Sequence, residues 1–129
     1  MEEMHPIPTG ATILVVEDEA LIGELVAEAL QEQGFHVFLA SNGPDALRYV
    51  ESGAAVDALF TDIHLSGGMN GSELARRVRS LRPEMPIVYA SGRWQPTDRE
   101  RLVPRSVFLP KPYDPHDAGT LLMRLVATH

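Results

Sequence analysis

The sequence predicts an α/β domain in which helices cover both faces of a five-stranded parallel sheet. Short apolar runs rich in β-branched residues alternate with stretches whose apolar residues recur every three or four positions. About five such units follow one another without an internal repeat, and the 129 residues suit one domain. Because strand–helix alternation with right-handed crossovers favours parallel pairing, we expect a doubly wound sheet.

Five short apolar runs are expected to form the strands. The first, TILVV, is continuous and β-branched, as is typical of a strand buried on both faces. The predicted strands are Thr12–Val16, His36–Ala40, Asp57–Asp62, Pro86–Ser91 and Val107–Leu109.

Helical spacing of apolar residues predicts five helices between and after these strands. Gly34 closes the first and Pro83 stops the third, and Pro44 suits a helix start. The four regular helices are expected around Leu21–Leu30, Pro44–Val50, Leu74–Leu81 and Ala118–Val126. We expect the fourth of the five, within residues 93–105, to be short or irregular, because prolines bracket that segment and its apolar face is thin.

Composition excludes several classes of protein. The chain has no cysteine, which excludes disulfide scaffolds and thiolate chemistry and is compatible with a cytoplasmic location. Its net charge of −7 argues against nucleic-acid binding, and no apolar run approaches the length of a membrane span. Residues 1–10 are acidic with two prolines and predict a flexible lead-in, so we assign residues 11–129 to the domain.

The residues that follow the predicted strands form a chemically distinctive set. Sites in doubly wound sheets form at the carboxyl ends of the strands. These positions hold Glu17, Asp18 and Glu19, then Asp62, then Ser91, and finally Lys111. Crowded carboxylates raise one another's pKa values or need a cation, and an all-oxygen site suits Mg²⁺ (or Mn²⁺). One carboxylate beside such a metal can act as a nucleophile toward a phosphoryl group.

Four motifs in this order resemble those of the response regulator receiver domains of two-component signalling, including the chemotaxis regulators. They are VVEDE after the first strand, FTDI at the third, YASG at the fourth and FLPKP at the fifth. The resemblance spans Thr12 to about Val126 and implies a flavodoxin-like sheet with strand order 2-1-3-4-5.

The resemblance also implies a role for each site residue. Asp62 would accept the phosphoryl group, and the metal would be held by Glu17, Asp18, Asp62 and the backbone carbonyl of His64. Ser91 and Lys111 would bind the phosphoryl group, and Phe108 would change rotamer as Ser91 moves. The side chains of His64 and Arg93 would flank the path of the hydrolytic water and tune the lifetime of the phosphorylated state.

Two features around the site are specific expectations. Ser66 stands where receivers usually carry a proline, and Gly67-Gly68 lengthens the loop by about one residue, so we expect a mobile loop after Asp62. The cis peptide bond that receivers use is expected between Pro110 and Lys111.

The predicted function is a single-domain phosphorylation switch rather than an enzyme, since it would catalyse only its own phosphoryl transfer and slow autodephosphorylation. A histidine kinase or phosphotransfer protein would supply the phosphoryl group. A downstream protein, or a second copy in a homodimer, would bind the face of the fourth helix, fifth strand and last helix, which includes Arg99, Arg101, Tyr113 and Leu121–Val126.

Three alternatives stay open from the residues alone. The chain could be a domain excised from a hybrid kinase. It could be a small phosphatase with an Asp nucleophile, although His64 occupies the position where those enzymes usually place a second Asp. It could be a degenerate receiver used only for binding, against which the intact Glu17, Asp18, Asp62 and Lys111 argue.

Overall fold

A single parallel sheet forms the centre of the molecule. The structure is a computed structural model, and it describes residues 10–92 and 102–127. The strand order is β2-β1-β3-β4-β5, as the sequence predicted. The strands are β1 (Thr12–Val16), β2 (His36–Ala40), β3 (Ala58–Asp62), β4 (Ile87–Ser91) and β5 (Ser106–Pro110). The sheet therefore places β1, β3 and β4 at its centre and leaves β2 and β5 as its edges.

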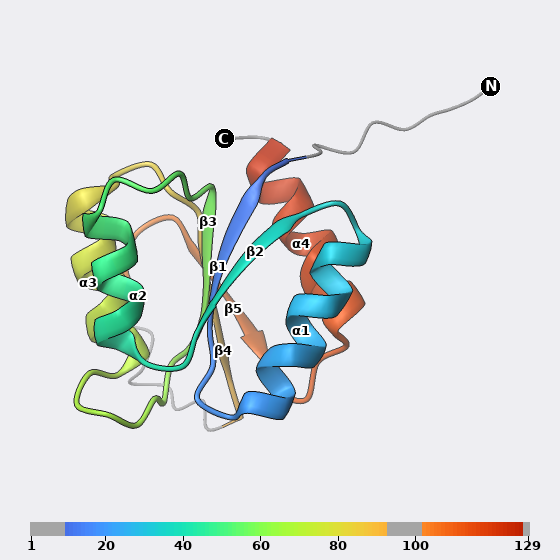
Figure 1. The fold of residues 1–129 in the computed structure, drawn as a ribbon, viewed down its shortest axis with the longest axis horizontal. Coiled ribbons are helices and arrows are strands. Elements are labelled where there is room, and N and C mark those ends of the chain that lie inside the picture. The colour runs from blue at the N-terminus through green and yellow to red at the C-terminus, as the bar shows by residue number, and fades with distance from the viewer. Residues whose placement is uncertain (1–9, 93–101, 128–129) are drawn as a thin grey trace.

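The structure describes four helices, two on each face of the sheet (Figure 1). Their bounds are α1 (Ala20–Glu32), α2 (Gly43–Glu51), α3 (Gly71–Leu81) and α4 (Pro115–Ala127), so α4 is the predicted last helix. In Figure 1, α2 and α3 lie on one face, and α1 and α4 lie on the other. None of these described helices has the length and apolar character that a membrane crossing requires.

Some expectations fall on residues that the structure does not describe. Most of the predicted irregular helix, residues 93–101, lies outside the described ranges, and so do Arg93, Arg99 and Arg101. Residues 102–105, which end that segment, form a bend and a turn. Residues 1–9 of the predicted lead-in also lie outside the description.

A hydrophobic core lies on each face of the sheet, between the strands and the helices that cover them. Alternate residues of each central strand point to opposite faces, so that Leu59 joins the core under α2 and α3 while Phe60 joins the core under α1 and α4. Every residue of β3 and β4 is buried, whereas the edge strands β2 and β5 are largely exposed or half-buried. The rigid part of the molecule is therefore the centre of the sheet.

Asparagine side chains fix the starts of α2 and α3. The Oδ1 atom of Asn42 accepts a hydrogen bond from the backbone N–H of Asp45 at 2.8 Å, and Asn70 accepts one from Glu73 at 2.9 Å. Such caps satisfy amide groups that a helix leaves unpaired in its first turn. Both helices thus begin at defined points just beyond the carboxyl edge of the sheet.

Arg79 on α3 anchors the chain that leads into β5. Its Nη2 donates to the carbonyl oxygens of Pro104 and Arg105 at 2.9 and 3.2 Å, and its Nη1 donates to that of Met85 at 2.6 Å. The hydroxyl oxygen of the fully buried Tyr89 accepts a hydrogen bond from the N–H of Val103 at 3.2 Å. These contacts tie the start of β5 to α3 and β4, which sets where β5 delivers its last residues.

The first residue of α3 approaches the end of β3 so closely that only glycine fits. The N–H of Gly71 donates to the carbonyl of Ile63 at 2.7 Å. A Cβ atom at Gly71 would lie 1.9 Å from the carbonyl oxygen of Asp62 and 2.9 Å from the Cα of Ile63. The packing of α3 therefore determines where the backbone of Asp62 lies.

We predict that Gly71→Ala lowers the free energy of unfolding by about 3 kcal/mol, at the upper end of the cost of overpacking. The new methyl group meets backbone atoms, which cannot turn away as a side chain could. Gly92→Ala is the matched control, because its Cβ would make only an ordinary contact with the Cβ of Lys111, at 3.6 Å. Urea denaturation measures both, and an equal effect of the two substitutions would contradict the packing argument.

Candidate functional site

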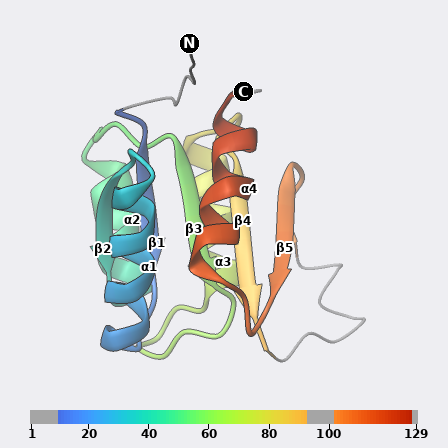
Figure 2. The same cartoon turned by 90° about the vertical axis from the view of Figure 1, so that its right-hand side faces the viewer.

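An acidic cluster lies at the carboxyl edge of the sheet, toward which the arrowheads of β4 and β5 point in Figure 2. Glu17 and Asp18 follow β1, and Asp62 is the last residue of the neighbouring β3. One carboxylate oxygen from each of the three lies within 4.8 Å of the others. Glu17 and Asp62 are only 5% and 9% exposed, so the charges are held close together in a partly desolvated place.

Lys111, the first residue after β5, reaches across the end of β4 into this cluster. Its Nζ donates a hydrogen bond to Oδ2 of Asp62 at 2.7 Å and lies 3.6 Å from Oε1 of Glu17. Its backbone N–H donates to the carbonyl of Ser91 at 3.0 Å. The predicted ammonium is thus paired with the predicted nucleophile.

A cis peptide bond follows Lys111, and it is not the bond that we expected. It joins Lys111 to Pro112, whereas the expectation of a cis bond between Pro110 and Lys111 was wrong. The reason is general, since only a bond that precedes a proline loses most of its preference for trans.

Backbone and side-chain donors orient the carboxylates. Oδ1 of Asp62 accepts a hydrogen bond from the N–H of His64 at 3.0 Å, and Oε2 of Glu17 accepts one from the N–H of Glu19 at 3.1 Å. Oδ2 of Asp18 accepts two from Ser66, from its N–H at 3.1 Å and from its hydroxyl at 2.9 Å. Each acid therefore has a fixed orientation before any ligand binds.

These surroundings shift the protonation equilibria in different directions. Burial raises the pKa of Glu17, against the lowering effects of the Glu19 N–H and of Lys111. Burial also opposes ionisation of Asp18, but the hydrogen bonds to its carboxylate, chiefly those from Ser66, together prevail and the pKa of Asp18 is lowered. For Lys111, burial disfavours the ammonium, yet the hydrogen bond to Asp62 and the negative charges of Asp62 and Glu17 prevail and its pKa is raised.

The two predicted switch residues lie beside the cluster on neighbouring strands. Ser91 is 1% exposed at the end of β4, and Tyr89, two residues earlier, points to the same face of the sheet. Phe108 of β5 is paired in register with Tyr89, is half-buried and packs against the same core. The sheet thus puts the predicted hydroxyl and aromatic on one side, toward the helices α2 and α3.

Two other predicted positions, His64 and Leu122, are less well placed for the roles expected of them. The side chain of His64 is exposed, and only its backbone N–H has a contact with Asp62. Within the predicted partner-binding stretch Leu121–Val126, Leu122 is fully buried in the core under α1 and α4. That residue cannot contact a partner, because it lies on the side of α4 that faces the sheet.

Sequence reasoning missed the contact that Ser66 makes with Asp18. The signal was present, since a serine replaces the expected proline in the loop after Asp62. A proline has no N–H and no hydroxyl, so it would provide neither of the two hydrogen bonds that Asp18 receives.

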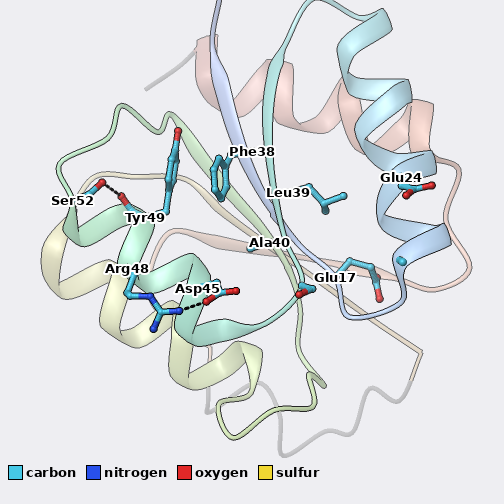
Figure 3. Close-up of a pocket in the computed structure, with 11 residues that line it drawn as sticks. Glu17, Glu24, Phe38, Leu39, Ala40, Asp45, Arg48, Tyr49 and Ser52 are labelled. Carbon is cyan, nitrogen blue, oxygen red and sulfur yellow. Dashed lines mark hydrogen bonds and ion pairs between the residues drawn. The ribbon is translucent and has the colours of Figure 1, made fainter.

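A hollow of about 580 Å³ lies along β2, and of the acidic cluster only Glu17 lines it (Figure 3). Phe38 and Tyr49 stack there with ring centroids 3.7 Å apart, and Glu17 lies toward one end. Neither Asp62 nor Lys111 lines this hollow.

A statistical description of the response regulator receiver domain matches residues 13–122, which is most of the chain. The chain belongs to the response regulator receiver domain family. A receiver protein from Sinorhizobium medicae WSM419 has a similar crystal structure, with a TM-score of 0.86, 35% sequence identity and coverage of 92% of this chain and 95% of that one.

Curated relatives of this receiver domain are longer proteins. The alkaline phosphatase synthesis transcriptional regulatory protein SphR of Synechococcus elongatus is 36% identical over 77% of this chain and 43% of its own length. The sensor kinase CckA of Brucella abortus is 29% identical over 98% of this chain and 14% of its own length. The chain spans less than half the length of these relatives.

The donor set of the receiver domain fits a hard divalent cation. One carboxylate oxygen from each of Glu17, Asp18 and Asp62 converges within 4.8 Å of the others. Oxygen ligands of this kind suit Mg²⁺ and Mn²⁺, whereas the cluster offers no imidazole or thiolate for zinc. A bound cation would also offset the repulsion among the three acids.

We predict that Glu17→Gln raises the free energy of unfolding of the metal-free receiver domain at neutral pH. Because the folded-state pKa of Glu17 lies above its ordinary value of 4.5, the folded state binds the proton more tightly than the unfolded state does. The contribution of Glu17 is favourable below pH 4.5 and is lost as the pH rises through the folded-state pKa.

Urea denaturation at several pH values in EDTA tests this prediction. The stability of Glu17→Gln is expected to fall less steeply than that of the wild type as the pH rises above 4.5. Glu28→Gln, on an exposed position of α1, is the control and is expected to follow the wild type. A variant that is less stable than the wild type at neutral pH would show that burial does not dominate at Glu17.

Proposed function

We propose that Asp62 accepts a phosphoryl group from a histidine kinase or a histidine phosphotransfer protein, and that the receiver domain then switches a protein partner. The observation that carries this proposal is the pairing of the buried Asp62 carboxylate with Lys111 at 2.7 Å, inside a cluster of three acids. An ammonium at this point favours the anionic carboxylate before the reaction and the phosphoryl oxygens after it.

The reaction is a displacement at phosphorus. A lone pair of an Asp62 oxygen forms the new O–P bond, the N–P bond of the phosphohistidine breaks, and its electron pair leaves with the imidazole nitrogen. We assign the attack to Oδ2, since its partner Lys111 has a flexible side chain that can follow the phosphoryl oxygens. Oδ1 is held by a backbone N–H instead, which cannot follow them.

Magnesium or manganese, when bound, would neutralise charge on the transferring oxygens. We propose that Glu17, Asp18, Asp62 and the backbone carbonyl of His64 hold it. The three carboxylates support this assignment through their mutual distances. Glu17 has a raised pKa, so cation binding is expected to release its proton when the site is loaded near that pKa.

Switching is assigned to Ser91, Lys111 and Phe108. The phosphoryl group would draw in the hydroxyl of Ser91, and Phe108 would take a different rotamer, which shifts an existing equilibrium between two conformations. The partner would bind the face that β5 and α4 present, including Tyr113 and the exposed part of Leu121–Val126. A second copy of the chain could occupy the same face in a homodimer.

Two other functions have less support. A phosphatase would need an acid two residues past its nucleophile, and this position is the exposed His64. A degenerate binding module would not need the paired Lys111 and Asp62. The proposed chemistry holds whether the chain acts alone or within a longer protein, and we propose a cytoplasmic location from the resemblance to receivers.

Phosphorylation by acetyl phosphate with Mg²⁺, followed by intact-mass measurement, tests the proposal. The wild type is expected to gain a single labile phosphoryl group, which EDTA prevents and Asp62→Asn abolishes. Asp57→Asn is a matched control at the opposite end of β3, where Asp57 accepts a hydrogen bond from the N–H of Thr12 at 2.7 Å. This control is expected to be phosphorylated like the wild type.

A different result would assign the chain to another class. If the wild type gains no phosphoryl group and forms no beryllofluoride complex, the receiver domain is a binding module. Phosphorylation that persists in Asp62→Asn would assign the acceptor to another residue.

The lifetime of the phosphorylated state is assigned to His64 and Arg93. We expect His64→Ala or Arg93→Ala to change the rate at which the adduct is lost, because both positions are proposed to flank the attacking water. Rates equal to that of the wild type in both variants would refute this role.

A further inference from the structure

Ser66 makes the loop after the proposed phosphoacceptor part of the metal site. Its N–H and its hydroxyl both donate to Oδ2 of Asp18, at 3.1 and 2.9 Å. Hydrogen bonds to an ionised acceptor are stronger than those between neutral groups. Two donors on one carboxylate oxygen fix the plane in which the Asp18 carboxylate lies.

The glycine pair that follows Ser66 turns the loop back toward α2. Gly67 and Gly68 have φ angles of +92° and +97°, a region that residues with a Cβ rarely adopt. Beyond them, Met69 packs closely on Gly43, the first residue of α2. A Cβ atom added at Gly43 would lie 3.0 Å from the Met69 side chain. The loop is therefore held at two points, on Asp18 by Ser66 and on the start of α2 by Met69.

We propose that Ser66 is a positioning residue for the divalent cation, and that it couples the conformation of the loop to metal binding. With Oδ2 held by Ser66, the Asp18 carboxylate would keep the orientation in which it can share a cation with Glu17 and Asp62. The inference rests on the proposed use of a divalent cation at this cluster. It adds a residue, Ser66, that the resemblance to receivers does not supply.

The same contacts would restrain a loop that contains two adjacent glycines. A loop of this composition loses much conformational entropy when it is fixed, so it needs specific contacts to hold it. Asp18 supplies one of those contacts through Ser66. Loss of the Ser66 hydroxyl is thus expected to make both the loop and the Asp18 carboxylate more mobile.

The test measures metal affinity directly and needs no phosphoryl transfer. Calorimetric titration with Mg²⁺, and electron paramagnetic resonance with Mn²⁺, compare wild type, Ser66→Ala and Ser66→Thr. Partners that hydrogen-bond to metal ligands are typically worth about 10–100-fold in affinity. Ser66→Ala keeps the backbone donor, so we expect a weakening at or below the lower end of that range, on the order of 3–10-fold.

Hydrogen exchange of the amides of residues 65–70 provides the second measurement. We expect faster exchange in Ser66→Ala than in wild type without metal, and less protection when Mg²⁺ is added. Ser66→Thr keeps both donors and is expected to restore affinity and protection. Ser80→Ala, whose hydroxyl donates to the carbonyl of Arg76 on the exposed side of α3, is the matched control and should match the wild type.

The outcomes distinguish a failure of the inference from a failure of the proposed phosphorylation. Unchanged affinity and exchange in Ser66→Ala would overturn it, and tighter metal binding would show that Ser66 competes with the cation instead. If the wild type binds no Mg²⁺ or Mn²⁺, the site is not a metal site and the inference falls with that part of the proposal. A weakened Ser66→Ala in a protein that takes up no phosphoryl group would support the inference and refute phosphorylation.

Discussion

Repulsion among three carboxylates at one edge of the sheet is the constraint on which the rest of this site depends. Two carboxylates about 4 Å apart repel by about 4 kcal/mol at an effective dielectric constant near 20. The strand order makes this crowding unavoidable, because β1 and β3 are neighbours, Glu17 directly follows β1 and Asp62 is the last residue of β3. Lys111 offsets part of the repulsion from across β4, so the position of β5 matters for chemistry on β3. That position is in turn maintained by Arg79 and Tyr89, which anchor the turn before β5.

The site is therefore built at a cost to stability that a ligand can recover. Glu17 is buried with a raised pKa, and a group in that state weakens the metal-free fold at neutral pH. Buried groups whose pKa is shifted by desolvation beside specific charged partners are common at functional sites, and they also occur in structural ion-pair networks. A cation or a phosphoryl group bound at these acids would change the electrostatic repulsion among them. We expect the structural response at the residues that hold each acid in place. Ser66 and the loop that follows it are such residues for Asp18.

The sequence predicted those features that depend on local patterns and on the ends of strands. The five strands, their order and the meeting of Glu17, Asp18, Asp62 and Lys111 follow from alternating apolar segments and from the resemblance of four motifs. The contact between Ser66 and Asp18 did not follow, because the two residues are 48 positions apart and the loop conformation depends on two residues with positive φ. The burial of Leu122 was missed for a related reason. An amphipathic helix shows which residues are apolar, but it does not by itself show which of them faces a sheet and which remains for a partner.

The site has a deeply buried part and a more exposed part, and this difference determines which elements can shift when the site changes. Asp62 and Ser91 end strands whose five residues are all buried, so neither strand can shift without disturbing both cores. Phe108 and Lys111 belong to β5 and its end, where the residues are half-buried or exposed. The loop that carries Ser66 is likewise at the surface. A change of charge at Asp62 would thus be accommodated by movement of β5 on one side and of the Ser66 loop on the other. Since β5 is also an edge of the sheet, a change at Lys111 and Phe108 would fall on the side of the molecule where we propose that a partner binds.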